Sequence, residues 1–577
     1  MSTTLPPPVQ DSVSVPSTSL PHPSHRPSSH QQKYDRQLRL WASQGQLALE
    51  NAHVLVVGSN ATATSALKNL VLPGFGNFTV LDEAIVDEGD LGANFFLEPS
   101  SLGRSRADEA VKFLGELNSD VNGHAIQTSL ATWLDSSRTV LAPYSLVLAV
   151  DVGPRDLATL CDRAWDAGVP LIQVESCGFF GTLTTQVEEV CIVETHPESL
   201  IDLRLSSPFP ALVEYSYSPA FDYALMDSKA HGHVPAVVIL IKGLEEWKES
   251  HNGSLPTGTA ERTEFISTIL KEKRAPDEEN FDEAVALYRR AGTRSGIPSE
   301  IKQLFEDPAC KNLDSNSSNF WILVHALERF SRLSSSSSAD APGVLPLTGS
   351  LPDMKAESRG YVELQNIYRA KARQDLEAFS EILDRVVDEK GIAGGTGRDG
   401  GKREIAREEV ESFVKHSGWL KVVRGRKITD MQRGETSLLK GKIAELFEQA
   451  TWSSPASLSL QIHLALVASS RFKVAHSRYP GETADPAEVE KDLEGLREVA
   501  DSVLREFGHE VGERDEGLDK CLQEVCRAAH STLPQTSALL GGLVAQEAIK
   551  LVTKQYVPLV GTCVWDGIHS MTGRIET

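Results

Sequence analysis

A run of mostly apolar residues at positions 53–57 ends directly at Gly58, and this arrangement constrains the fold more than any other in the sequence. An unbroken apolar run is typical of a parallel strand that is buried on both faces. A helical pattern follows at residues 62–72 and is closed by Pro73 and Gly74. Further apolar runs at residues 78–82, 146–151 and 170–175 alternate with helical stretches. This alternation predicts an α/β fold, a doubly wound Rossmann-like parallel sheet with right-handed crossovers.

From about residue 197 the pattern changes to long helices. Apolar residues recur at steps of three and four in residues 320–330 and 364–386. A serine tract at 334–338 and a glycine-rich stretch at 391–401 are typical of exposed loops. Near the C-terminus we expect a helix at 536–552, followed by strand patterns at 556–560 and 562–565. The α/β part is therefore expected to carry a large, mainly helical insertion.

The formal net charge of −23 restricts the classes of partner. Binding to nucleic acid and to an anionic membrane surface both require a basic surface, so we expect neither as a partner. The longest apolar run, at residues 234–241, is far shorter than the roughly 20 residues that a membrane-spanning helix needs. The acidic balance serves solubility in the simpler interpretation, and recognition of a basic partner is the alternative.

The N-terminus and the cysteines indicate the compartment. Residues 1–32 are rich in Pro and Ser and contain no apolar segment, which predicts a disordered arm rather than a signal peptide. Seven cysteines are scattered through the chain without a Cys-x-x-Cys pair, a pattern that favours neither a disulfide framework nor structural zinc. We therefore expect a protein of the cytoplasm, the nucleus or both.

The turn after the first strand has the position of a phosphate-binding loop but not its composition. Of a G-x-G-x-x-G pattern only Gly58 is present, because Asn60 and Ala63 occupy the other two glycine positions. Asp82, 24 residues after Gly58, lies where dinucleotide folds place a ribose-binding carboxylate, although an acid that closes a strand is also common in turns. We interpret the loop as a structural turn that binds no cofactor.

Several segments carry a resemblance to a known family. Residues 34–38, 72–76 and 540–550 resemble the adenylation half of ubiquitin-like-protein activating enzymes, which have a ThiF/MoeB-like adenylation fold. Residues 33–41, 67–74, 202–205, 320–323 and 351–354 resemble more specifically the regulatory subunit of the heterodimeric neddylation activating enzyme. The resemblance extends from Lys33 to the end of the chain.

The resemblance implies a domain organisation and a set of partners. An adenylation-like domain would comprise residues 33–190 and 520–577, and residues 191–519 would be a helical insertion equivalent to a catalytic-cysteine domain. The partners would be a catalytic, cysteine-bearing subunit and the ubiquitin-like modifier of neddylation. ATP and magnesium would be held by the partner subunit, and the pair would adenylate the C-terminal glycine of the modifier and pass it to the partner's cysteine.

The departures from the family pattern predict that this chain has no catalytic site of its own. In the run after the second strand, a second acid and an arginine of the family are replaced by Ala84 and Ala93. Arg106 falls where the family has a catalytic lysine, and these two side chains present different donors to phosphate. Asp151 matches a metal-binding aspartate but would stand almost alone, so no metal is expected here. Cys310 has no family motif around it and is interpreted as structural.

Two regions are expected to act on the partner. By resemblance, Arg36 reaches in trans into the ATP site of the catalytic subunit, whereas in an unrecognised sequence it would be interpreted as a solvated surface group. The partner interface is expected in the segment after the serine tract, at Pro346, Leu347, Leu351, Pro352, Asp353 and Met354. The alternative for this segment is an ordinary loop that packs on its own helices.

Three other functions remain open from the residues. The chain could be the regulatory subunit of another ubiquitin-like pathway, or a non-enzymatic scaffold on the same fold. An NAD-dependent dehydrogenase is possible on fold alone, but the incomplete glycine loop argues against it.

Overall fold

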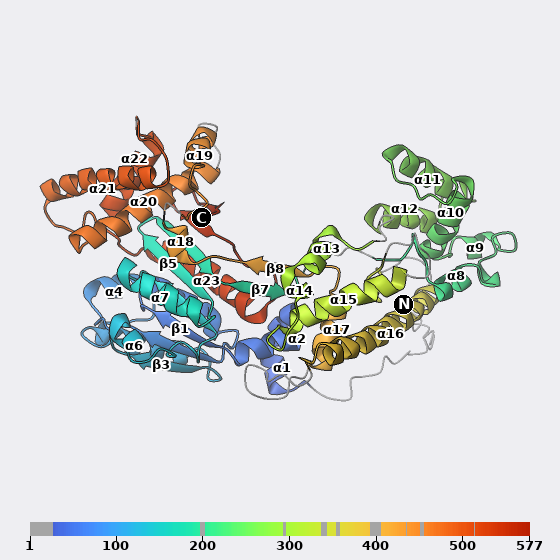
Figure 1. Cartoon of the computed structure of the whole chain (residues 1–577), viewed down its shortest axis with the longest axis horizontal. Coiled ribbons are helices and arrows are strands. Elements are labelled where there is room, and N and C mark those ends of the chain that lie inside the picture. The colour runs from blue at the N-terminus through green and yellow to red at the C-terminus, as the bar shows by residue number, and fades with distance from the viewer. Residues whose placement is uncertain are drawn as a thin grey trace, which may run out of the picture.

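The computed structural model describes residues 27–196, 202–291, 296–335, 343–352, 358–392, 405–433, 436–450, 455–512 and 514–577. Figure 1 shows two lobes side by side. The α/β lobe contains the sheet and is formed by the described residues of 27–188 and 425–577, and the helical lobe is formed by those of 193–420.

The α/β lobe is built on an eight-stranded sheet with the order β10-β9-β6-β5-β4-β1-β2-β3. Neighbours among β1 to β5 pair in parallel, with Val54 opposite both Phe78 and Leu146, and the β5–β6, β6–β9 and β9–β10 pairs are antiparallel. The doubly wound fold that the sequence predicts is confirmed. The strands are β1 (His53–Val57), β2 (Asn77–Leu81), β3 (Asn122–Ile126), β4 (Leu146–Val150), β5 (Leu171–Cys177), β6 (Phe180–Gln186), β9 (Thr562–Asp566) and β10 (Met571–Ile575).

Helices cover both faces of this sheet, which explains why β4 is apolar at every position and why residues 54–57 of β1 are apolar on both faces. Val54 and Val56 of β1 face a core shared with α2, α3, α5 and α23. Leu55 and Val57 face the opposite core, with α6, α7 and α18. The helices of this lobe are α1 (Ser29–Lys33), α2 (Asp35–Glu50), α3 (Ala61–Val71), α4 (Glu88–Ala93), η1 (Pro99–Ser101), α5 (Arg106–Gly115), α6 (Leu130–Asp135), α7 (Pro154–Asp166), α18 (Ile428–Met431), α19 (Ile443–Ala450), α20 (Pro455–His476), α21 (Pro486–Glu506), α22 (Glu516–Ala528) and α23 (Pro534–Thr553).

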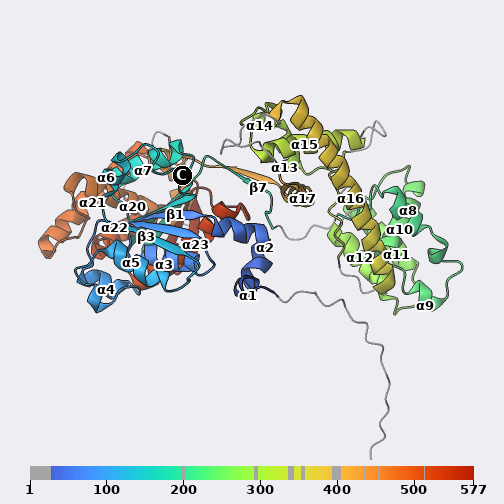
Figure 2. The same cartoon turned by 90° about the horizontal axis from the view of Figure 1, so that it is seen from below.

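The helical lobe has two cores that are joined by one long helix. Helix α16 contributes Leu364 and Tyr368 to the core of α8, α10, α11 and α12, and Phe379 and Val386 to the core of α13, α14, α15 and α17. Figure 2 shows α16 extending between these two groups of helices. The helices of the helical lobe are α8 (Pro210–Ser216), η2 (Pro219–Phe221), α9 (Ser228–His231), α10 (Ala236–Ser250), α11 (Thr259–Lys271), α12 (Glu279–Ala291), α13 (Ser299–Glu306), α14 (Pro308–Lys311), α15 (Asn319–Ser335), α16 (Ser358–Glu389) and α17 (Arg407–Lys415).

A two-stranded antiparallel ribbon connects the lobes. Strand β7 (Glu189–Ile192) leads out of the α/β lobe and pairs with β8 (Lys421–Arg424), which leads back. Helices α19 to α22 lie within the segment 191–519 that was expected to form the insertion, but they pack on the sheet through Phe180 and Val564. The helical lobe therefore ends near residue 420.

The N-terminal arm differs in its last residues from the expectation. Residues 1–26 lie outside the described residues, but Ser29–Lys33 form helix α1. The Ser28 hydroxyl accepts the Gln31 N–H, and His30 contacts Glu50 of α2 at 2.6 Å. The following helix, α2, is interrupted at Trp41 and Ala42 and continues past Gly45. No helix among the described residues is long and apolar enough to cross a membrane.

Candidate functional site

The carboxyl ends of β1, β2 and β4 surround a cavity of about 370 Å³. The strand order reverses between β1 and β4, and doubly wound sheets bind ligands at this reversal. This cavity is therefore the place to which the prediction applies that the loop at Gly58 binds no cofactor. Its polar lining includes Asn60, Asp82, Asp90, Arg106, Asp151, Lys473, Tyr479 and His530.

The loop between β1 and α3 fills the place where a phosphate would bind. Gly58 has a φ of +87°, and a Cβ there would lie 2.7 Å from the carbonyl oxygen of Val150. Asn60 caps α3, because its side-chain oxygen accepts the N–H groups of Thr62 and Ala63, each at 3.1 Å. These N–H groups are the donors that a helix N-terminus offers to an anion. The cap of α3 is thus supplied by the chain itself.

Asp82 is held by its own chain in the same way. Its Oδ2 accepts the backbone N–H and the hydroxyl of Ser59 at 2.9 and 2.6 Å, and lies 2.8 Å from the Arg106 Nε. Arg106 also contacts Asp90 at 3.1 Å. Burial would raise the pKa of Asp82, but the Arg106 guanidinium and the hydrogen bond from Ser59 lower it overall. The carboxylate at the ribose position is therefore ionised and already paired.

Asp151 uses its oxygens within the chain as well. Asn60 Nδ2 donates to Asp151 Oδ2 at 2.6 Å, and Ser176 donates to the same carboxylate from its hydroxyl and its backbone N–H. The Nε2 of His530 lies 3.8 Å from Oδ1. A magnesium ion needs free carboxylate oxygens together with phosphate and water ligands. The surroundings of Asp151 do not fit this ion.

A stack of side chains forms the wall of the cavity beside β4 and β5. The Lys473 Nζ lies 3.9 Å from the centre of the Tyr479 ring, which is stacked on His530 with a centroid distance of 3.7 Å. Burial lowers the pKa values of Lys473 and His530. Burial also raises the pKa of the nearby Glu175 to about 7, although its hydrogen bond from Ser470 opposes this. Burial therefore disfavours the charged forms of both Lys473 and His530 in this wall.

The cysteines offer no activated thiol. All seven lie in the described part of the chain, five of them buried. Burial raises the pKa of each thiol, that of Cys310 to about 12. A thioester-forming cysteine requires the opposite shift, because the thiolate is the nucleophile. The geometry agrees with the structural interpretation of Cys310.

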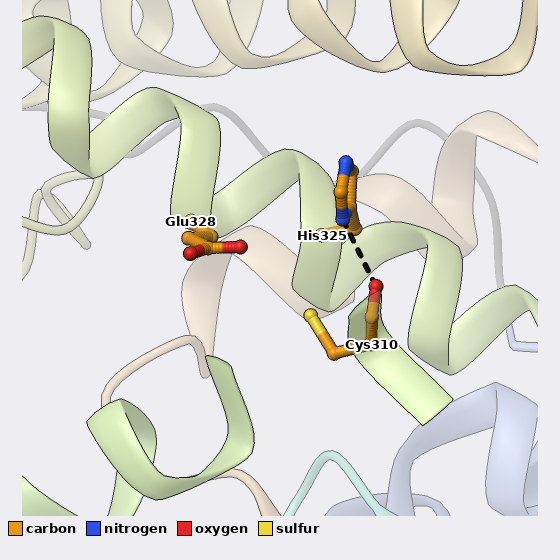
Figure 3. Close-up of side chains that lie close together, drawn as sticks. All are labelled: Cys310, His325 and Glu328. Atoms are coloured by element: carbon orange, nitrogen blue, oxygen red, sulfur yellow. Dashed lines mark hydrogen bonds between the residues drawn. The ribbon is translucent and has the colours of Figure 1, made fainter. Parts of the chain in front are cut away.

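Cys310, His325 and Glu328 lie close together (Figure 3), and their metal-ligating atoms are within 4.8 Å of one another. The His325 Nδ1 donates to the carbonyl oxygen of Cys310 at 3.0 Å, so this nitrogen carries the proton and has no lone pair for a metal. The other ring nitrogen points away from the cluster. Glu328 is paired with Lys311 and Arg332. The His325 Nδ1 and the Glu328 carboxylate are thus already bonded within the chain, and only the His325 Nε2 is buried without a hydrogen-bond partner among the described residues.

The two regions expected to act on a partner lie at different depths. Arg36 is exposed and makes no ion pair with any described residue, whereas Arg39 is paired with Asp35 at 3.1 Å. Pro346 and Leu347 are buried, and the Leu347 N–H donates to Asp375. Leu351 and Pro352 are half-buried, and Asp353 and Met354 lie outside the described residues. The alternative of a loop packed on its own helices thus describes Pro346 and Leu347.

Sequence reasoning missed the contacts that close the cavity. Nothing in the sequence pairs Asn60 with Asp151, or brings Lys473, Tyr479 and His530 to the ends of β4 and β5. The one available signal was that Ala84, Ala93 and Arg106 together replace three parts of the family's nucleotide site. This indicated that the site had changed.

Comparison with known proteins agrees with the fold. The ThiF family profile matches residues 34–570. The Rossmann-like sheet agrees with this match and defines the class of protein, and the chain belongs to the ThiF family.

Close relatives give the subfamily. The NEDD8-activating enzyme E1 regulatory subunit of Danio rerio is 35% identical over 556 residues, which is 95% of this chain and 99% of the relative. That of Gallus gallus is 35% identical over 96% of this chain and 99% of its own. The regulatory subunit AXR1 of Arabidopsis thaliana is 35% identical over 93% and 94%. This chain belongs with these NEDD8-activating enzyme E1 regulatory subunits, and the expected resemblance is confirmed.

Proposed function

We propose that this chain is the non-catalytic half of a heterodimeric enzyme that activates the neddylation modifier. Its partner would be a subunit that carries the catalytic cysteine and holds ATP and magnesium. Together they would adenylate the C-terminal glycine of the modifier and form a thioester on the partner's cysteine. The chain would work in the cytoplasm, the nucleus or both.

The chemistry explains why only one nucleotide site is needed. The terminal carboxylate of the modifier attacks the α-phosphorus of ATP, and the bond to pyrophosphate breaks. The partner's thiolate then attacks the acyl carbon of the adenylate and releases AMP. A subunit with no nucleotide and no activated thiol can contribute by binding, by shaping the second subunit and by supplying charge in trans.

The observation that carries this proposal is the self-pairing of the groups in the cavity. Asn60 is bonded to Asp151, and Arg106 is paired with Asp82 and Asp90. ATP would have to break these contacts before it could use the loop, the ribose carboxylate or the metal carboxylate. Buried charge pairs that lose one partner are strongly destabilised, so this exchange is unfavourable.

Arg36 supports a role across the subunit interface. Its guanidinium is exposed and unpaired among the described residues, and it extends from the first turn of α2. Adenylyl transfer builds negative charge on the leaving pyrophosphate, and a fixed cation stabilises that charge. A guanidinium also presents paired donors that match phosphate oxygens. We infer that Arg36 contacts the triphosphate held by the partner.

We propose a second contact with the partner in the later part of the segment that follows the serine tract. Leu351 and Pro352 keep exposed surface, whereas Leu347 anchors the segment in the core of the helical lobe. A segment anchored in this way loses little conformational entropy when its exposed residues bind a partner. The proposed contact comprises Leu351, Pro352, Asp353 and Met354.

Reconstitution tests the whole proposal. The chain alone, the cysteine-bearing partner alone and the two together are assayed for ATP–pyrophosphate exchange and for a thiol-sensitive adduct with the modifier. We expect both activities with the pair and neither with this chain alone. A stable complex without activity would favour a scaffold, and activity with a different ubiquitin-like protein in preference would assign the chain to another pathway.

A further inference from the structure

Helix α2 is interrupted where its sequence gives no reason for a break. Trp41 has a φ of −124°, and Ala42 has a φ of 55° and a ψ of −176°, a conformation that residues other than glycine rarely adopt. Residues 39–44 contain neither Pro nor Gly. Such a conformation persists only where surrounding contacts hold it. The residues before the break carry Arg36.

The contact that holds the break comes from the other end of the chain. Gln555 is 6% exposed, and its Nε2 donates to the carbonyl oxygen of Trp41 at 3.0 Å. A Cβ at Gly45 would lie 3.0 Å from this Nε2 and 2.8 Å from the Trp41 Cβ. Glycine at position 45 therefore gives the carboxamide access to the inside of the bend.

The other end of the Gln555 carboxamide is also fixed. Its Oε1 accepts the Nε2 proton of His196 at 3.1 Å, and the ring of His196 is stacked on Tyr556 at 4.2 Å. The backbone N–H of Tyr556 donates to Glu194, whose carboxylate accepts the hydroxyl of Ser412 in α17. Gln555 thus lies where α2, the end of α23 and the link to the helical lobe meet.

We propose that Gln555 is a positioning residue for Arg36. The segment 35–40 is anchored on one side by Tyr34, which is buried and hydrogen-bonded to Asn118, and on the other by the carbonyl of Trp41. No ion pair with a described residue fixes the Arg36 side chain, so its direction depends on these two anchors. The inference rests on the proposed function, because it concerns the arginine that would act in the partner's site.

The chain offers a matched control for Gln555. Gln186 is also buried, and its Nε2 donates to the carbonyl oxygen of Cys161 at 2.7 Å while its Oε1 accepts the Ile428 N–H at 2.9 Å. Gln186→Leu and Gln555→Leu therefore remove the same groups and the same number of hydrogen bonds. Only Gln555 touches α2.

The experiment measures pyrophosphate exchange by the complex with the cysteine-bearing partner, for both variants and for Gln555→Leu combined with Arg36→Ala. We expect Gln555→Leu to lower the rate about tenfold, since a misplacement of about 1 Å can cost up to about 100-fold. In the Arg36→Ala background its further effect should stay within about twofold, as should that of Gln186→Leu in the wild type. Gln555→Glu, which keeps the acceptor for His196 and loses the donor to Trp41, should act in the same direction if Gln555→Leu fails to fold.

The outcomes separate the inference from the function on which it rests. If Arg36→Ala alone leaves the exchange rate unchanged, the role in trans is wrong, and the inference falls with it. If Arg36→Ala is impaired but Gln555→Leu is not, only the inference is overturned. The inference is overturned as well if the combined variant shows the product of the separate losses of Arg36→Ala and Gln555→Leu. It is also overturned if Gln186→Leu lowers the rate as much as Gln555→Leu. Faster hydrogen exchange of residues 35–41 in Gln555→Leu, with unchanged exchange in β1 and β4, would support it.

Discussion

Asn60 and Asp151 are joined by a 2.6 Å hydrogen bond across the end of the sheet, although they lie 91 positions apart in the chain. Asn60 also caps α3, so one side chain occupies the phosphate position and binds the carboxylate that would hold a metal. The two halves of a nucleotide site are thereby bonded to each other.

The isolated chain should therefore not bind ATP in the low micromolar range, with or without magnesium. Any nucleotide would have to displace Asn60 from Asp151 and Arg106 from Asp82. Calorimetric titration of the purified chain measures this directly. A thiol-sensitive adduct with the modifier should also be absent, since burial raises the pKa of each cysteine thiol. Tight ATP binding or such an adduct would contradict the assignment.

The Arg106→Ala variant should lose about 3 kcal/mol of unfolding free energy, because it leaves Asp82 buried without its partner. Denaturant unfolding of the isolated chain measures the change. Arg104→Ala is the control, since this side chain is 60% exposed and Glu109 keeps its bonds to Ser101 and Lys112. The control should cost less than about 1 kcal/mol. Equal losses in both variants would refute the role of the buried pair.

The Glu175→Gln variant should change how stability depends on pH. Because burial raises the folded-state pKa of Glu175 from 4.5 to about 7, its protonated form is favoured in the fold. The contribution of this group to stability is complete below about pH 4.5 and is lost as the pH rises through 7. Relative to the variant, the wild type should lose on the order of 3 kcal/mol as the pH rises from below 4.5 to above 7, since one pKa unit corresponds to about 1.4 kcal/mol.

Denaturant midpoints of both proteins from pH 5 to 8 give this comparison. The variant keeps an oxygen that can accept the Ser470 hydroxyl, so the hydrogen bond at 2.7 Å is preserved. Glu490→Gln, at an exposed position of α21, serves as the control and should follow the wild type. Parallel curves for wild type and Glu175→Gln would show that this carboxyl titrates normally.

The Arg36→Ala variant should slow adenylation by the complex roughly 10- to 150-fold, the equivalent of a charge-assisted hydrogen bond of roughly 1.5–3 kcal/mol. Subunit association and thermal stability should stay near wild type, because Arg36 is exposed and pairs with no described residue. Arg39→Ala is the internal control, since Arg39 is paired with Asp35. Indistinguishable pyrophosphate exchange in the two variants would rule out the role in trans.

Replacing Leu351 and Met354 by Asp should weaken the heterodimer without unfolding the chain. Leu351 packs only partly against the core of the helical lobe, so a carboxylate there keeps contact with water in the free subunit. Leu347→Asp, in contrast, should unfold the lobe, because Leu347 is only 2% exposed within its core. Affinity is measured by titration of the partner and folding by thermal melting. Unchanged affinity of the Leu351 and Met354 variant would place the interface elsewhere.

The sequence was sufficient for the elements that depend on local pattern. The strand at 53–57 follows from apolar residues on both faces, and the helices in 320–330 and 364–386 follow from spacing of three and four. The sequence also predicts a loss of nucleotide chemistry, because Ala84, Ala93 and Arg106 replace three parts of one site. These inferences use only the pattern of neighbouring residues or the pattern of the family. None of them requires knowledge of a contact between residues far apart in the chain.

Features set by distant contacts could not be predicted. The break at Trp41 and Ala42 depends on Gln555, 514 positions from Trp41. The bond between Asn60 and Asp151 and the stack of Lys473, Tyr479 and His530 likewise need the folded chain. The boundary of the helical lobe was missed because α20 and α22 have the same helical pattern whether they pack on a sheet or on other helices.

The β7–β8 ribbon also has an evolutionary consequence. Ile192 and Lys421 are register partners, so the chain leaves and re-enters the α/β lobe at adjacent strands, about 5 Å apart. The helical lobe is thus connected to the sheet by two neighbouring stretches of backbone, the arrangement in which domain insertion is best tolerated. A single genetic event could have added, removed or exchanged this lobe while the eight-stranded sheet kept its order. A change of this kind would leave the parallel register of the central strands untouched.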